Sequence, residues 1–125
     1  MGQWKTRNYT QGDFLGRGGY ARCYQMKDEE TGHVYAAKMI QMAAVANSPK
    51  TRFKIKREIK IHKALDHPNI VKFYHSFEDD QYVYMLLHEC KNKTMKELLI
   101  RRERLTEFEV KSYTLQILEG LKYLR

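Results

Sequence analysis

The residues with the clearest chemical meaning are a glycine-rich turn, LGRGGYARC at 15–23, and a lysine, Lys38. Glycines let a backbone come close to phosphate oxygens, because no side chain holds the oxygens away, and they permit the φ > 0 conformations of tight turns. Lys38 could place a cation on the α- and β-phosphates of a nucleotide. Both features predict phosphate binding, although such glycines can simply form a hairpin and a strand-end lysine can simply reach solvent.

Glu58 helps to decide between these interpretations. Spacings of three and four place Glu58 on the same helical face as Ile55 and Ile59, the face that should pack against the rest of the fold. A carboxylate is costly to bury there unless it is paired. Lys38 is the natural partner, so the sequence predicts a Lys38–Glu58 ion pair that positions the lysine for phosphate.

The segment after the glycines indicates the kind of phosphate-binding loop. A P-loop requires Gly-Lys-Ser/Thr at the start of a helix, and that motif is absent. A dinucleotide-binding fold also requires a helix after the turn. Residues 20–26 are instead typical of a strand. The type that remains is the loop of protein kinases, in which the glycines lie between two strands.

The elements that must position these residues predict an α+β fold. The expected strands are residues 9–15, 20–26, 33–40, 70–77 and 82–87. A helical turn is expected at 42–46, and a helix at 51–65. Two further helices follow Cys90, and Thr106 and Glu109 form a capping box at the start of the second. The apolar stripe of that helix comprises Val110, Tyr113, Ile117, Leu121 and Leu124.

Composition predicts one globular domain rather than a disordered chain, because 42% of the 125 residues are hydrophobic and 30% are charged. No apolar run approaches the roughly 20 residues of a membrane-spanning helix. The two cysteines, Cys23 and Cys90, are far apart and form no C-x-x-C motif, which predicts a reducing, intracellular compartment. No histidine shares metal-ligand spacing with a second His or Cys, so we expect no metal site.

The formal charge of +8 is concentrated in residues 50–63 and 91–104. A nucleic-acid patch is one interpretation, but apolar residues at helical spacing favour solvated helix faces, and no nucleic-acid partner is expected. The opening MGQWKT matches a myristoylation pattern at Gly2, and Lys5 and Arg7 add a second weak membrane signal. Because short patterns often match by accident, no membrane partner is expected.

From about residue 9 to residue 125, the chain resembles the N-terminal part of Ser/Thr protein kinases, and most closely polo-like kinases. Ala21 and Cys23 replace the third glycine and the valine of the generic loop G-x-G-x-x-G-x-V, which is similar to the polo-like loop GxGG(F/Y)AxC. Cys90 and the runs EIKIHKALDHPNIV, FEDDQYVY and RRERLTEFEV resemble the same family.

The resemblance implies a tail at 1–8 and then a partial kinase domain. Its N-lobe, a five-stranded antiparallel sheet plus one helix, would cover 9–87. The hinge would be 88–91, and the first two helices of the C-lobe would lie within 92–125.

The resemblance also implies roles for individual residues. Lys38 and Glu58 would set the active arrangement. The residues expected to line the adenine site are Leu15, Cys23 and Ala36 above the base and Leu87 as gatekeeper, with hinge hydrogen bonds from the backbones of His88 and Cys90. The backbone near three glycines would cover the phosphates: Gly16, Gly18 and Gly19. His88 stands where the family usually has Glu, which changes the side-chain environment more than a backbone contact.

The parent of such a chain would use ATP and Mg²⁺ to phosphorylate protein Ser or Thr in cell-division control, in the cytoplasm, nucleus or centrosome. Residues 1–125 contain neither H-R-D nor D-F-G, the motifs of the catalytic base and the Mg²⁺ ligands. We therefore expect weak nucleotide binding and no phosphotransferase activity from these residues alone. The alternative is a naturally truncated product that binds a protein partner, with aggregation or partner dependence through its exposed stripe. A basic nucleic-acid or membrane-surface module is a less favoured alternative.

Overall fold

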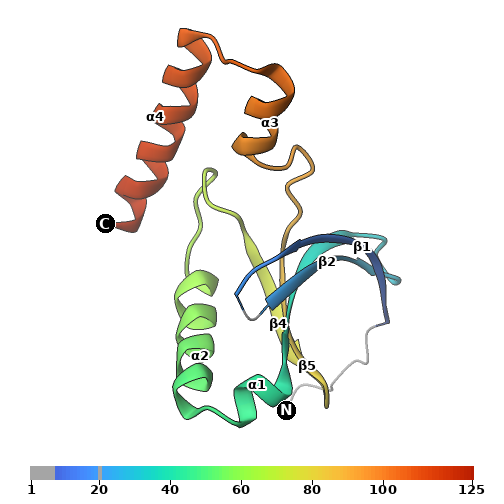
Figure 1. The fold of residues 1–125 in the computed structure, drawn as a ribbon. Helices are drawn as coiled ribbons and strands as arrows, with labels where there is room; N and C mark the ends of the chain where they lie inside the picture. The colour runs from blue at the N-terminus through green and yellow to red at the C-terminus, as the bar shows by residue number, and fades with distance from the viewer. Residues whose placement is uncertain (1–7, 20) are drawn as a thin grey trace.

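The computed structural model describes residues 8–19 and 21–125, which form a five-stranded antiparallel sheet and four helices (Figure 1). The strands are β1 (Tyr9–Arg17), β2 (Ala21–Asp28), β3 (Val34–Gln41), β4 (Phe73–Glu78) and β5 (Tyr82–His88), in the spatial order β1-β2-β3-β5-β4. The helices are α1 (Met42–Ala46) and α2 (Pro49–Lys63), between β3 and β4, and α3 (Met95–Arg102) and α4 (Glu107–Leu124), after β5. The predicted α+β fold is therefore confirmed.

The strand register divides the sheet into two faces, because successive side chains of a strand point to opposite sides. Lys38 lies opposite Cys23 of β2 and Met85 of β5, and we call the face that carries these residues the inner face. Met39 lies opposite Arg22 and Tyr84 on the other side, which we call the outer face.

Each face has its own hydrophobic core. The inner-face core consists of Ala21, Ile40, Val45, Ile55, Phe73, Val83 and Met85. The outer-face core consists of Met26, Ala37, Met39 and Leu86, partly covered by Tyr9, Tyr24, Tyr35, Phe77, Tyr82 and Tyr84. Helix α2 contributes buried Ile55 and half-buried Ile59 to the inner-face core. This packing brings the side of α2 that carries Glu58 to the inner face of the sheet.

The position of α2 is fixed at both of its ends. Ser48 is the N-cap, and its hydroxyl accepts a hydrogen bond from the Thr51 N–H at 3.2 Å, while Pro49 occupies the first turn. At the other end, His62 Nε2 forms a hydrogen bond with the carbonyl oxygen of Val71 at 2.7 Å. Because both ends are held, the helix presents a defined set of residues to the sheet.

Helices α3 and α4 lie beyond one end of the sheet, and α4 comes close to the α2–β4 connection (Figure 1). The Asn69 amide donates to the Gln116 carbonyl at 2.9 Å, and the Asp66 N–H donates to the Tyr123 hydroxyl at 2.9 Å. Gly120 is buried against this connection, where an added Cβ would lie 3.5 Å from the Asn69 carbonyl oxygen. Helix α4 is therefore attached by these two hydrogen bonds, by the close fit at Gly120 and by a ring contact between His67 and Tyr123, whose centroids are 5.0 Å apart.

The capping box is confirmed. The Thr106 hydroxyl accepts from the Glu109 N–H, and the Glu109 carboxylate accepts from the Thr106 N–H, both at 3.1 Å. The apolar stripe of α4 is largely exposed: Ile117, Leu121 and Leu124 have 58%, 56% and 51% of their surface exposed.

Several element boundaries differ from those expected by one to three residues, and two of these differences have a clear local cause. Strand β4 begins at Phe73 rather than at residue 70, because the Ile70 N–H donates to the His67 carbonyl at 3.1 Å and prolongs the turn. Helix α2 begins at Pro49 rather than at Thr51, because Ser48 caps it two residues earlier. Tyr20, the expected start of the second strand, lies outside the described residues.

The basic residues of α2 confirm the expected solvated face, since most side chains of 50–63 are exposed or half-buried and only Ile55 is buried. The myristoylation pattern at Gly2, with Lys5 and Arg7, falls outside the described residues. None of the helices described here is long and apolar enough to span a membrane.

Candidate nucleotide-binding site

The predicted ion pair between Lys38 and Glu58 is present. The Lys38 ammonium donates to Glu58 Oε1 at 2.7 Å and joins β3 to α2. The two side chains are 26% and 38% exposed, so the pair lies at the surface of the inner face rather than in the core. A cation in this position is held in place by its carboxylate and can still be reached by an anionic ligand.

The strand register aligns most of the other predicted residues with Lys38. Gly16 of β1 lies opposite Cys23 of β2, and Cys23 lies opposite Lys38 of β3. The three residues therefore form one row across the sheet. Ala36 and Leu87 form the next inner-face pair, across β3 and β5. These residues are separated by up to 71 positions in sequence, and the sheet brings them onto one surface.

Leu15 stands apart from this row. It falls within the irregularity of the β1–β2 register between Phe14 and Gly16, and 43% of its surface is exposed. The structure thus brings Leu15 to the edge of the candidate site without packing it against the row.

The glycine-rich turn is open, as close approach of a ligand requires. A Cβ added at Gly16 or Gly19 would meet no heavy atom within 4 Å, and at Gly18 only the Ala21 carbonyl oxygen at 3.9 Å. The Gly18 N–H donates to that carbonyl at 2.9 Å. The expected φ > 0 conformations are wrong for this turn, because Gly32, in the β2–β3 turn, is the only described glycine with positive φ. Glycine matters here for the absence of a side chain.

Burial raises the pKa of the Cys23 thiol, and the nearby Lys38 charge partly offsets this effect. The thiol therefore stays protonated at neutral pH. In this form Cys23 is a small, weakly polar surface beside Lys38.

The predicted hinge, residues 88–91, has two of its backbone groups already engaged. The His88 N–H donates to the Lys72 carbonyl at 2.9 Å, and the Cys90 carbonyl accepts from the Lys93 N–H at 3.0 Å. A base bound here would have to use the His88 carbonyl and the Cys90 N–H. The His88 side chain shares the outer face with Tyr35, its register partner in β3, so the histidine at this position does not alter the inner face.

Sequence reasoning missed Glu89, which follows the last residue of β5. The Gln25 amide donates to Glu89 Oε1 at 2.8 Å, and this bond ties β2 to the hinge. The second carboxylate oxygen of Glu89 is buried and has no hydrogen-bond partner among the described residues. No sequence signal could have paired residues 25 and 89, because only the folded sheet brings them together.

These residues fit the phosphates of a nucleotide but do not supply a metal site. Lys38 provides a held cation, and the open turn provides room for phosphate oxygens next to the backbone. Within the described part of the chain, no group of three or more His, Cys, Asp or Glu side chains could hold a metal ion. The arrangement can therefore bind and orient a polyphosphate, while any Mg²⁺ ligands from protein would come from elsewhere.

Comparison with known proteins gives a family and several relatives. The family "Protein kinase domain" matches residues 9–125. The cell cycle serine/threonine-protein kinase CDC5/MSD2 of Saccharomyces cerevisiae is 51% identical over 122 residues, which are 96% of this chain and 17% of that protein. The serine/threonine-protein kinase PLK2 of Mus musculus is 47% identical over 118 residues, covering 94% of this chain and 17% of that protein. The serine/threonine-protein kinase polo of Drosophila melanogaster is 43% identical over 118 residues, covering 94% and 20%. The chain spans a fifth or less of the length of these relatives.

Proposed function

The chain belongs to the protein kinase domain family, and from this premise we propose that it is the ATP-binding N-terminal part of a polo-like serine/threonine kinase. The parent protein would transfer the γ-phosphoryl group of ATP to Ser or Thr hydroxyls of proteins in cell-division control. Its sites of action would be the cytoplasm, the nucleus or the centrosome. The similarity to kinases of the polo type over nearly the whole chain supports this proposal.

The observation that carries the proposal is the 2.7 Å contact between Lys38 and Glu58. A lysine on the third strand, paired with a glutamate on the following long helix and placed beside a glycine-rich turn, is the phosphate-holding arrangement of protein kinases. In this arrangement Lys38 would bind the α- and β-phosphates. Glu58 would keep the ammonium group over the inner face.

The remaining site residues would contact either the phosphates or the adenine. The backbone at Gly16, Gly18 and Gly19 would cover the phosphates, and Cys23, Ala36 and Leu87 would contact the adenine. Mg²⁺, when bound with ATP, supplies charge neutralisation for the phosphates. Residues 1–125 lack the motifs that bring the catalytic base, so this polypeptide alone should bind nucleotide weakly and transfer no phosphate.

A titration of the isotope-labelled chain with ATP, followed by amide chemical shifts, tests the site. We expect shifts at Gly16, Gly18 and Gly19, and their loss in the variant Lys38→Met. Lys27→Met is the matched control, because Lys27 is an exposed lysine of the neighbouring strand. Shifts that survive Lys38→Met, or that fall on the basic side of α2 instead, would contradict the assignment.

A second candidate function is capture of a protein partner by α4. The exposed side chains of Ile117, Leu121 and Leu124 favour it, since continuous apolar surface of this kind is normally covered. Light scattering across a concentration series is the test. Self-association that Leu121→Glu abolishes would support an adhesive stripe, whereas a monomer at all concentrations would argue against it.

A further inference from the structure

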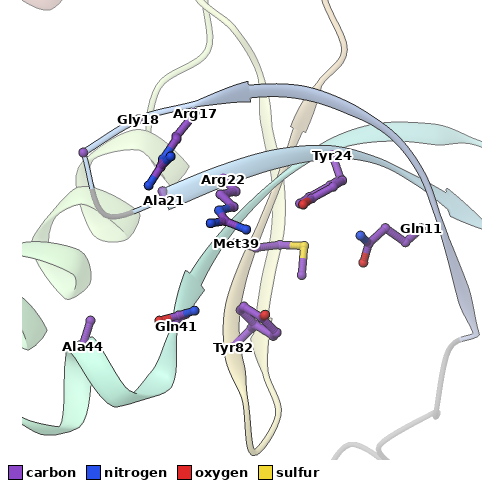
Figure 2. Close-up of a pocket in the computed structure, with 11 residues that line it drawn as sticks. Gln11, Arg17, Gly18, Ala21, Arg22, Tyr24, Met39, Gln41, Ala44 and Tyr82 are labelled. Carbon is purple, nitrogen blue, oxygen red and sulfur yellow. The ribbon is translucent and has the colours of Figure 1, made fainter.

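A small cavity lies on the outer face of the sheet, on the opposite side from Lys38 (Figure 2). Its volume is about 290 Å³, near the lower end of the range for ligand pockets. The described residues that define it most clearly are Arg17, Gly18, Arg22, Met39, Gln41 and Tyr82. The cavity therefore lies beneath the turn whose inner side would cover nucleotide phosphates.

Two arginines give the cavity its charge. Arg17 and Arg22 lie directly opposite each other across the β1–β2 ladder, next to the turn. Like charges in directly opposed positions of an antiparallel pair are destabilising. Among the described residues, the cavity lining contains no Asp or Glu, and neither arginine forms an ion pair. An unfavourable pair of guanidinium groups without a carboxylate therefore faces a cavity.

The rest of the lining is apolar or neutral. Met39 is buried and forms the floor, and the half-buried rings of Tyr24 and Tyr82 line the sides. Figure 2 shows the Arg22 side chain over Met39, with Gln41 and Tyr82 on the opposite side of the cavity. Both arginines are exposed and can be reached from solvent. The cavity thus combines an anion-binding edge with an apolar floor.

We propose that this cavity binds a phosphorylated serine or threonine side chain of a partner protein. A phosphate monoester carries a charge of about −1.5 to −2 at pH 7 and has three acceptor oxygens. A phosphate group is therefore a better ligand for two guanidinium groups than a single carboxylate is. The Met39 floor would take an apolar side chain next to the phosphorylated residue. The proposal goes beyond the ATP site: the two sites share the turn at Gly18 and Gly19, but Arg17 and Arg22 lie on the face of the sheet opposite to Lys38.

The chemistry of the cavity favours a peptide over a nucleic acid. A nucleic-acid backbone needs a track of basic residues along which successive phosphates can bind. Apart from Arg17 and Arg22, the described residues that line the cavity are of the types Gly, Ala, Gln, Tyr and Met. The two basic runs of the chain do not line the cavity: residues 50–63 lie on α2, which packs against the other face of the sheet, and residues 91–104 include α3.

Fluorescence anisotropy with the whole chain tests the proposal. The probes are a labelled peptide pool with a fixed central phosphoserine and degenerate flanks, and the same pool with serine in its place. We expect the phosphorylated pool to bind at least tenfold more tightly. The double variant Arg17→Gln/Arg22→Gln should lose this preference, while Arg52→Gln/Arg57→Gln, which removes the same charge from two exposed positions on α2, should keep it.

Three results would overturn the proposal. Equal binding of the two pools would show that phosphate is not recognised, and equal loss of binding in Arg52→Gln/Arg57→Gln would show a response to net charge alone. A random-sequence single-stranded oligonucleotide that displaces the phosphorylated pool from the cavity at lower concentration would assign the surface to nucleic acid. Far-ultraviolet circular dichroism of the double variant checks that a loss of binding is not a loss of fold.

Discussion

The sheet with α1 and α2 differs from the α3–α4 pair in how it is stabilised. Among the described residues, every buried hydrophobic side chain belongs to the sheet, to α1 or to α2. In α3 and α4 the only buried residue is Gly120. The first region is stabilised by burial of apolar surface on two faces, whereas the second depends on caps, an ion pair and hydrogen bonds to the α2–β4 connection. The candidate ATP site is built almost wholly on the first region, which contains both hydrophobic cores.

The comparison implies that equal truncations should have unequal effects. Ile40→Ala removes a fully buried side chain of the inner-face core and should lower the free energy of unfolding by about 2–5 kcal/mol. Leu121→Ala, at 56% exposure on α4, should change it by less than about 0.5 kcal/mol. Urea denaturation followed by circular dichroism measures both. If the two variants changed the free energy of unfolding by similar amounts, Leu121 would contribute to stability as much as a core residue, despite its exposure.

The hydrogen bonds between the α2–β4 connection and α4 should matter only locally. Asn69→Ala removes the bond to the Gln116 carbonyl, a loss of about 0.5–1.5 kcal/mol. We expect faster amide hydrogen exchange in α4 and unchanged exchange in β3 and β5. Asn92→Ala, at another exposed asparagine, is the control. Faster exchange throughout the sheet would mean that the two regions unfold as one unit.

The opposed arginines of β1 and β2 are expected to weaken the sheet slightly. In the absence of a ligand, Arg17→Gln should raise the free energy of unfolding by about 0.2–1 kcal/mol, because it removes like-charge repulsion. The gain should shrink at high salt, which screens exposed charges. Melting curves at two salt concentrations, with Arg57→Gln as the control, measure it. A lower melting temperature for Arg17→Gln would show that the arginine is stabilising where it stands.

The smallest effect is expected at the start of α4. The Arg102 guanidinium, together with the hydrogen bond from the Thr106 N–H, lowers the pKa of Glu109 from 4.5 to about 2. Because the pKa is lower in the folded state, the stabilisation is present above about pH 4.5 and is lost as the pH falls toward 2. Glu109→Gln should therefore lower the melting temperature near pH 7 but not near pH 2. If the melting temperatures of Glu109→Gln and of the unsubstituted chain differ by the same amount at every pH, the effect would come from packing instead.

Local sequence signals predicted much of the fold. The capping box at Thr106 and Glu109 depends on residues three positions apart, so it could be recognised without the fold. Burial of Ile55 followed from helical periodicity in the same way. The Lys38–Glu58 pair joins residues 20 positions apart, and it was predictable because helical periodicity places Glu58 on the same side of α2 as Ile55 and Ile59, which pack on the sheet.

Other features could not be predicted, because they depend on how distant strands align. Two shifts in the β1–β2 register decide that Arg17 faces Arg22 and that Leu15 leaves the row of site residues. The bond from Gln25 to Glu89 requires β2 to reach the hinge across the sheet. The late start of β4 depends on the turn at His67, which overrides the strand-like pattern of residues 70–72.

By itself, the sequence determined the types of element and the place of the glycine-rich turn, and it indicated the charge pair, because propensity and periodicity act over short distances. Only the tertiary structure decided which face each of these residues shares. A shift of one residue in strand register moves a side chain from one face to the other, and register is set by the packing of the whole sheet. The Lys38 site and the Arg17–Arg22 cavity therefore lie on opposite faces for a reason that no local pattern contains.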